Sequence, residues 1–200
     1  KLFTGEQHYN QCIGVLSPPL PQLLEEALGV PFPDYLCQRT IKRYILHTEN
    51  EHITVADEEN PSFALRRIQY DTYMLKTVQE RGINVVHARA VDLEFHQDRV
   101  VIYTENLPLE AEVVVGAFGL DEGSASMFTR HTSYQPPQAL GSIVTKVHPQ
   151  PEEMGDFAMG IHAFLPCHPG IEFGGITPKE NYLAINIAGG NVDTNLMKYF

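Results

Sequence analysis

Short β-rich segments fill most of the chain after residue 82, and they constrain the fold more than any other feature of the sequence. Along 91–95, apolar Val91, Leu93 and Phe95 alternate with acidic residues, which predicts a strand with one face in solvent. The run at 113–115 is β-branched without alternation, as expected of a strand covered on both faces. Similar patterns predict further strands at 83–86, 100–103, 141–147, 158–165, 170–176 and 182–187, the last four forming an antiparallel sheet.

Two segments carry a helical pattern. Ser17-Pro18 is typical of a helix start, and apolar residues at helical spacing run from Leu20 to Leu28, ahead of a terminating Gly29. The second helix is predicted over 70–82, with Met74, Leu75 and Val78 as its buried stripe and Gly82 as its end.

The remaining segments complete a mixed architecture. Residues 41–46 and 53–56 are predicted to pair as a hairpin, and the Ser-, Gly- and Pro-rich stretch 121–138 is predicted to be a crossover or linker. The fold class is therefore α/β with α+β character. We expect two regions, a helix-containing region at 1–122 that includes the hairpin and a β-sheet region at 123–200.

Composition excludes several classes of function. The chain has 43% hydrophobic residues, typical of a folded protein, and a net charge of −11, which argues against binding to nucleic acid. Its longest apolar run, Val113–Leu120, is too short to span a bilayer. The three cysteines lack a C-x-x-C pair and the histidines lack metal-ligand spacing, so we expect no metal site and a reducing, cytoplasmic compartment.

Three short stretches are candidates for chemistry. The first is Cys12-Ile13-Gly14-Val15-Leu16-Ser17-Pro18, where exposed N–H groups at a helix start favour an anion or an electron-rich ring edge. A buried small residue followed by an ordinary helix cap explains the same pattern. The second is Arg67, ahead of the 70–82 helix, which suits a phosphate or carboxylate and is equally compatible with a surface arginine.

The third stretch is Val113 to Asp121. Its glycines, Gly116 and Gly119, follow a predicted buried strand, where they permit close approach of the backbone to a nucleotide. Taken alone they are also typical turn glycines. No P-loop occurs, and the stretch is not a G-x-G-x-x-G fingerprint.

In this order and spacing, the three stretches resemble FAD-dependent oxidoreductases of the p-hydroxybenzoate-hydroxylase-type fold, and most closely the geranylgeranyl reductase family. That family has a C-x-G-x-x-S-P-like stretch, then R-x-x-F/Y-D-x-x-L, matched here by Arg67, Tyr70 and Asp71, and then V-V-G-A-D-G, matched by 114–119. Residues 176–179 and 184–187 resemble its substrate-domain strands. One departure stands out, because Phe118 occupies the position of the family's aspartate.

The resemblance implies part of an FAD/NAD(P)-binding three-layer domain followed by a mostly antiparallel substrate sheet. It implies reduction of isoprenoid double bonds by hydride from reduced FAD, with NAD(P)H as a donor, an apolar small-molecule substrate and peripheral membrane contact. It implies that Arg67, Gly116, Gly119 and Asp121 bind the cofactor. It also implies that Cys12, Gly14, Ser17 and Pro18 face the flavin ring and the substrate.

Two alternatives share this architecture, a flavin monooxygenase or halogenase-type enzyme and a binding module that has lost its cofactor. The βαβ fingerprint and the G-D-A-A-G segment of the family have no counterpart in these 200 residues. We therefore expect the chain to be the middle of a longer protein and, by itself, to bind FAD weakly or not at all.

Overall fold

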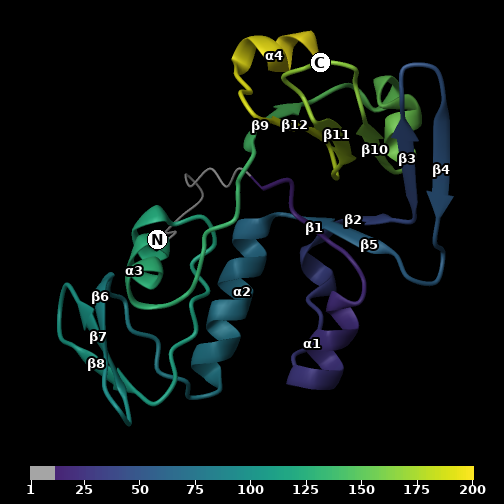
Figure 1. Cartoon of the computed structure of the whole chain (residues 1–200). Coiled ribbons are helices and arrows are strands. Elements are labelled where there is room, and N and C mark those ends of the chain that lie inside the picture. The colour runs from purple at the N-terminus through teal and green to yellow at the C-terminus, as the bar shows by residue number, and fades with distance from the viewer. Residues whose placement is uncertain (1–11) are drawn as a thin grey trace. The chain divides into compact units, whose positions relative to one another are not determined.

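The computed structural model describes residues 12–200, which separate into two compact units (Figure 1). The larger unit combines the chain up to Ile83 with Leu140–Phe200, and the smaller unit comprises Asn84–Ala139. The two regions expected from the sequence meet at 122/123. The two compact units of the structure instead have boundaries at 83/84 and 139/140, because the smaller unit is inserted into the larger one along the chain.

A six-stranded sheet forms one half of the larger unit, in the order β4-β3-β10-β11-β12-β9. Every neighbouring pair is antiparallel except β3 and β10, which are parallel. The predicted hairpin at 41–56 is confirmed and forms one edge of this sheet. The strand bounds are β3 (Arg43–His47), β4 (His52–Ala56), β9 (Gly141–Val147), β10 (Ile161–Phe164), β11 (Phe173–Pro178) and β12 (Leu183–Gly189).

A second, three-stranded sheet in the larger unit carries both of its long helices. Its order is β1 (Val15–Leu16), β5 (Ser62–Leu65) and β2 (Cys37–Ile41), the last preceded by the short η1 (Asp34–Leu36). Leu24 of α1 (Leu20–Leu28) and Tyr70 of α2 (Arg67–Glu80) are buried against Leu16 and Leu65. This apolar cluster fixes both helices to the short sheet.

The two sheets of the larger unit pack through a few side chains from each. Tyr44 and Ile161 are cross-strand neighbours on one face of the six-stranded sheet. They contact Val15, Ile41 and Ala64 of the short sheet. Because side chains alternate along a strand, the residues of odd number on β11 and even number on β12 share this face, which we call the inner face.

The opposite, outer face of the six-stranded sheet bears a short helix. Asp193 accepts hydrogen bonds from Asn195 N and Leu196 N and so caps α4 (Thr194–Tyr199). The ring of Phe200 lies over Gly174, where a Cβ atom would overlap it. Two 3-10 turns, η2 (Pro151–Glu153) and η3 (Gly155–Met159), lead into β10.

The smaller unit is a three-stranded meander packed on one helix. It comprises β6 (Ala90–Phe95), β7 (Val100–Thr104), β8 (Leu109–Ala111) and α3 (Glu122–His131). Leu93, Val100 and Met127 form its core. Asp92 of β6 receives hydrogen bonds from Arg130 and His131 at the end of α3, at 3.1 and 2.9 Å.

Three predictions of local structure are wrong. Residues 83–86 and 113–115 form no strand, and Val113 and Val115 are largely exposed. A strand buried on both faces needs pairing neighbours and covering layers, and residues 12–200 provide none there. The stretch 121–138 contains α3, because Asp121 caps a helix whose Ser- and Gly-containing first turn resembles a linker in composition.

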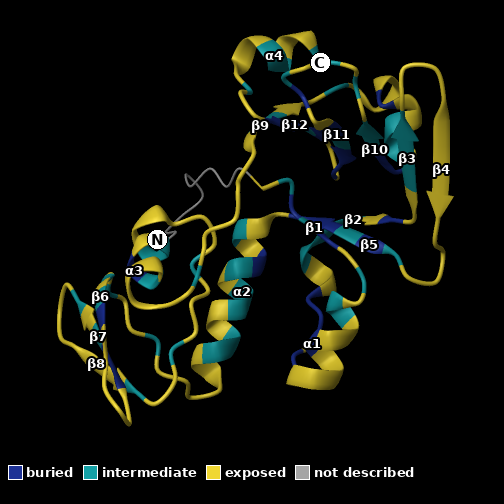
Figure 2. Cartoon of the chain, in the orientation of Figure 1, coloured by how far each residue is buried: buried dark blue, intermediate teal, exposed yellow. Residues whose placement is uncertain are grey.

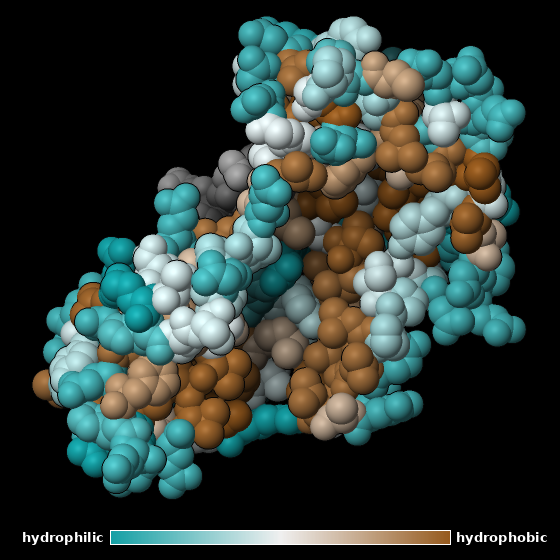
Figure 3. Space-filling model, viewed as in Figure 1, coloured by the Kyte–Doolittle hydropathy of each residue, from teal (hydrophilic) through white to brown (hydrophobic). Residues whose placement is uncertain are grey.

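Both long helices are confirmed, but their boundaries and buried faces differ from the prediction. The first begins at Leu20 with Pro19 as its N-cap, and Gly29 ends it in the left-handed conformation as predicted. Of its apolar stripe only Leu24 is buried, while Leu23 and Leu28 are about half exposed. Figure 2 shows that much of the α1 surface is exposed, and Figure 3 shows hydrophobic residues in the same part of the view. On α2, Tyr70 is the buried residue and Leu75 is exposed.

The Asp121 cap predicts a matched pair of outcomes. Asp121→Ala leaves the Ser124 N–H without its side-chain acceptor and is expected to destabilise the smaller unit by about 1 kcal/mol. Asp121→Asn, which caps equally well, is expected to stay within about 0.5 kcal/mol of the original chain. Hydrogen exchange of the α3 amides measures both, and equal protection in the two variants would contradict the cap.

Candidate functional site

The first sequence motif forms a tight junction between the two sheets of the larger unit. The Gly14 N–H donates to Cys12 Sγ at 3.3 Å, and Leu65 N donates to Gly14 O at 2.8 Å. Gly14 has a φ of +67°, and a Cβ atom there would overlap Leu65 O. Only glycine satisfies both demands, so this residue sets the path of the Cys12–Ser17 segment.

A buried lysine closes this junction from the six-stranded sheet. Lys179 directly follows β11 and is 1% exposed. Its Nζ donates to Gly14 O and Leu65 O, both at 2.9 Å. Burial lowers the pKa of this ammonium from its ordinary 10.5 to about 8, against the opposing influence of Cys12 and Cys37. At neutral pH Lys179 therefore still holds its proton beside the motif, with a pKa of about 8.

An arginine reinforces the same contact from the short sheet. Arg39 of β2 donates from Nε to Lys179 O at 3.1 Å and from Nη1 to Ala158 O at 3.2 Å. These bonds tie β2 to β11 and to η3. The backbone around Lys179 is thus fixed by an arginine, while its side chain fixes the backbone around Gly14.

A chain of hydroxyl groups runs beside the junction. Tyr44 on the inner face donates to Ser62 Oγ at 2.5 Å, and Ser62 Oγ donates to Ser17 Oγ at 3.1 Å. Ser17 thus serves this chain rather than capping α1. Pro18, partly buried, follows it in the turn that leads to the helix.

The second motif lies next to the first. Arg67 begins α2 and forms an ion pair with Asp71 at 2.6 Å, with about two fifths of each side chain exposed. Its pKa is raised, mainly by the hydrogen bond to Asp71 and to a smaller extent by Cys12. Its backbone nitrogen lies against Gly14. The structure therefore brings Cys12, Gly14 and Arg67 together.

Further along the inner face, small and apolar residues form one row across the sheet. Its central members are Ala163 and Gly175, and the carboxamide oxygen of Asn186 lies 2.9 Å from the place that a Gly175 Cβ atom would take. In the part of the chain that the structure describes, Asn186 Oδ1 and Thr177 Oγ1 on this face are buried without hydrogen-bond partners. The full row is Ile53, Leu46, Ala163, Gly175, Asn186 and Val144.

The third motif lies in the smaller unit, and an aromatic ring covers its first glycine. The ring of Phe118 lies over Gly116, at the place of a Cβ atom, and packs against Phe128 and Tyr134 at centroid distances of 5.1 and 5.7 Å. Gly119 has a φ of +58° with no atom near its Cβ position, which identifies it as a turn glycine. The carboxylate of Asp121 accepts from Ser124 N.

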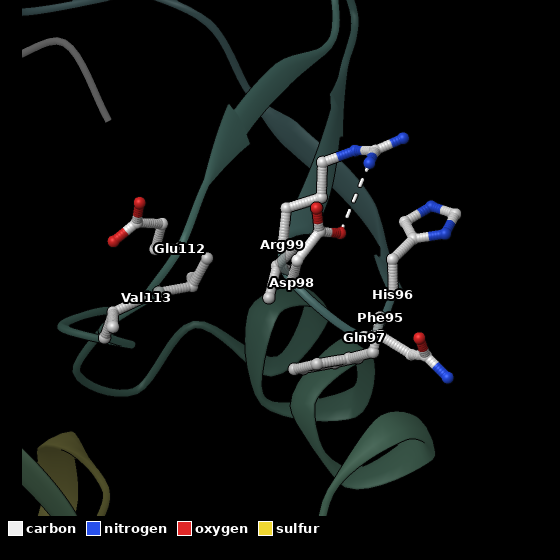
Figure 4. Close-up of a pocket in the computed structure, with 9 residues that line it drawn as sticks. Phe95, His96, Gln97, Asp98, Arg99, Glu112 and Val113 are labelled. Atoms are coloured by element: carbon white, nitrogen blue, oxygen red, sulfur yellow. Dashed lines mark hydrogen bonds and ion pairs between the residues drawn. The ribbon is translucent and has the colours of Figure 1, made fainter.

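An open recess of about 370 Å³ lies elsewhere in the smaller unit, between the 95–100 turn and residues 112–114 (Figure 4). Its arginine, Arg99, is held by Asp98 at 3.3 Å and by Glu110 at 3.4 Å. None of the residues predicted for cofactor or substrate lines this recess. It therefore adds nothing to the site at Gly14.

Two kinds of feature are absent from residues 12–200. No helix there is long and apolar enough to cross a membrane. No group of three or more His, Cys, Asp or Glu side chains is arranged to hold a metal ion in that range.

Comparison with known proteins relates this chain to flavoproteins through structure alone. No family model and no curated protein matches its sequence. Its fold resembles part of the p-hydroxybenzoate-hydroxylase-type flavoprotein fold, and the matching structures include a flavoprotein/dehydrogenase and a halogenase. A flavoprotein/dehydrogenase from Cytophaga hutchinsonii superposes with a TM-score of 0.66 at 14% identity, over 96% of this chain and 49% of that one.

Two enzyme complexes show similar agreement. The halogenase PltM in complex with phloroglucinol and FAD has a TM-score of 0.68 at 13% identity, over 96% of this chain and 48% of PltM. CtdE in complex with FAD and a substrate has a TM-score of 0.65 at 9% identity, over 95% of this chain and 50% of CtdE. The chain spans about half the length of these structures. The similarity supports the flavoprotein fold and does not single out the geranylgeranyl reductases within it.

The overlap at Gly14 predicts a large loss of stability on substitution. Gly14→Ala adds a Cβ atom at positive φ and against Leu65 O, and is expected to destabilise the larger unit by at least about 3 kcal/mol. Gly82→Ala, at φ +74° with open space around it, is the matched control and should cost about 1 kcal/mol. Urea unfolding measures both, and equal losses would refute the close approach.

The Lys179 pKa predicts a rise of stability with pH. Between about pH 8 and 10.5 the unfolded chain binds more protons at this group than the folded chain, so raising the pH should stabilise the fold, by about 2–4 kcal/mol in all. The measurement is the free energy of unfolding across this range for the original chain and for Lys179→Met, which should lose the rise. Lys42→Met, at an exposed ion pair, should keep it.

Proposed function

We propose that the chain is part of an FAD-dependent oxidoreductase that acts on a small, largely apolar organic molecule, in the manner of flavin monooxygenases and halogenases. The observation that carries this proposal is the superposition of nearly the whole chain on FAD complexes of such enzymes. The convergence of Cys12, Gly14 and Arg67 in the larger unit adds independent support.

The residues of the larger unit fit a flavin. Cys12 and Ser17 are exposed, while Gly14 between them is buried with its N–H and C=O already hydrogen-bonded. Arg67 keeps a partly exposed guanidinium able to pair with a pyrophosphate. In the proposal, Cys12, Ser17 and Pro18 face the flavin ring and the substrate, and the buried Gly14 sets the path of the segment that carries them. The row from Ile53 to Val144 forms the apolar wall, with Asn186 as its polar group.

When bound, FAD supplies the redox chemistry, with NAD(P)H proposed as the electron donor. The residues of this chain supply position and protons. Lys179 holds Gly14 O in place, and the Tyr44–Ser62–Ser17 chain holds hydroxyl protons at the edge of the inner face. The apolar row excludes water from a substrate lying on it.

The smaller unit fits a cofactor less well. Phe118 covers Gly116, and the Asp121 carboxylate is already used as a helix cap. The roles of Gly116, Gly119 and Asp121 as cofactor contacts therefore depend on movement of the Phe118 ring. The same observation favours the alternative of a binding module without a cofactor.

Reduction of isoprenoid double bonds is the second candidate activity. It is favoured by the Cys12–Pro18 segment, which matches the motif of the geranylgeranyl reductases and lies against the short sheet that packs on the inner face. An extended apolar chain would suit the row of small side chains there. This activity would imply peripheral contact with a membrane, from which such substrates come.

One experiment separates these activities. The full-length protein that contains this chain is purified, its visible spectrum is recorded, and it is supplied with FAD, NADPH and either aromatic or isoprenoid substrates, with and without oxygen and halide. Gain of an oxygen or a halogen atom in the product supports the first activity, and anaerobic gain of two hydrogens supports the second. A protein that binds no flavin and consumes no NADPH refutes both and leaves the binding module.

Substitution of Phe118, whose ring lies over Gly116, tests whether Gly116 contacts the cofactor. Phe118→Asp removes the ring and restores the carboxylate of the family motif, so the affinity of the full-length protein for FAD should rise about tenfold. Phe118→Ala uncovers Gly116 without adding a carboxylate and should give a smaller gain. Fluorescence quenching of FAD measures the affinities, and no change in either variant would remove Gly116 from the cofactor site.

A further inference from the structure

A pair of histidines crosses the joint between the hairpin and the rest of the six-stranded sheet, on its outer face. His47 of β3 and His162 of β10 lie 2.8 Å apart, from Nε2 to Nδ1. Their rings are nearly coplanar, at 12°, with centroids 5.0 Å apart, as a hydrogen bond between ring edges requires. His162 is 5% exposed, so this bond lies inside the fold.

The backbone of η3 decides which nitrogen of each ring carries the proton. His162 Nε2 lies 3.1 Å from Asp156 O, and since a carbonyl only accepts, this nitrogen donates. In the neutral ring, Nδ1 of His162 is then an acceptor, and His47 Nε2–H donates to it. It follows that Nδ1 of neutral His47 is unprotonated, and the described residues provide no donor for it.

His47 lines an open groove of about 290 Å³ with aromatic walls. Phe164 stacks on His47 at 4.6 Å and 11°, and Phe200 meets Phe164 edge to face at 5.3 Å. The remaining lining residues are Thr48, Glu49, Leu165, Pro166 and Tyr199. All belong to the larger unit, on the face of the sheet opposite to the candidate site.

The charge in this groove is negative. Glu49 forms no ion pair with any cation in residues 12–200, and its charge raises the pKa of the neighbouring Cys167 thiol. A carboxylate, an acceptor nitrogen and aromatic walls suit a ligand with a cationic donor and a ring. The volume of about 290 Å³ lies just below the usual range for ligand pockets, about 300–1,000 Å³, and so favours a single ring with a short arm.

We propose that this groove binds a small aromatic amine in its protonated form, with the ammonium group on Glu49 and His47 Nδ1 and the ring against Phe164, Tyr199 and Phe200. The proposal does not rest on the activity of the candidate site, because it concerns the other face of the sheet and requires no flavin.

The titratable groups around His47 set the pH dependence of binding. They are Glu49 in the β3–β4 turn, His52 on β4, His162 on β10, and Cys167, His168 and Tyr199 near the groove. Burial, and then the charges of His162 and His52, lower the pKa of His47. Its Nδ1 therefore stays an acceptor at neutral pH, and protonation in acid converts it into a donor that repels an ammonium group.

Calorimetric or NMR titration with 2-phenylethylamine tests the proposal, with 3-phenylpropionate as the probe of similar size and opposite charge. At neutral pH the amine is expected to bind with a Kd of about 0.1–1 mM and the acid at least tenfold more weakly. Binding of the amine should weaken as the pH is lowered and His47 becomes protonated. Equal affinity for the two probes, or no saturable binding of the amine, overturns the proposal.

Variants locate the binding. Glu49→Gln removes the charge with little change of shape and is expected to weaken amine binding at least fivefold, whereas Glu51→Gln, in the same turn but outside the groove, should change it less than twofold. His47→Gln should abolish the pH dependence. Should that variant fail to fold, Glu49→Gln still decides, since unchanged binding in it overturns the proposal.

Discussion

The buried ammonium group of Lys179 is the interaction on which the arrangement of the larger unit depends. A buried charge is costly unless its hydrogen bonds are made, and here two main-chain carbonyls, of Gly14 and Leu65, supply them. These carbonyls lie at the three-stranded sheet, while Lys179 follows β11 of the six-stranded sheet. Any displacement of one sheet against the other would leave the charge unpaired. The inner face, the Cys12–Ser17 segment and Arg67 are thereby held in one register.

Much of the fold could be predicted because the order of apolar and polar residues along a strand indicates which of its faces is buried. The alternation at 91–95 and the runs at 141–147 and 182–187 correspond to β6, β9 and β12. The predictions failed where tertiary context decides. Residues 113–115 have the composition of a buried strand but find no pairing partner in residues 12–200. Likewise, the Ser- and Gly-rich start of α3 is helical because Asp121 caps it and Met127 packs in the core.

The candidate site was predictable only in part, for the same reason. Cys12, Gly14 and Arg67 could be proposed from the sequence because a thiol, a glycine and a guanidinium have distinctive chemical properties that follow from residue type alone. Lys179 was visible only as one member of a family-like strand segment, and its burial depends on carbonyls more than a hundred residues away. Tyr44 and Ser62 are ordinary strand residues by sequence, and only the packing of two sheets joins them to Ser17.

The two faces of the six-stranded sheet differ because of what packs on each. On the inner face the short sheet packs against Tyr44 and Ile161, and further along the sheet the amide of Asn186 lies over Gly175. On the outer face, among residues 12–200, a short helix and a 3-10 turn approach the sheet, and larger rings such as His47 and Phe164 line a groove. Strand alternation places these two chemistries on consecutive residues, Gly174 under an aromatic ring and Gly175 under a carboxamide. A one-residue shift of β11 would exchange these environments and bury Phe173 or Ile176 against the wrong layer. The register that Lys179 fixes at the end of β11 therefore maintains both faces at once.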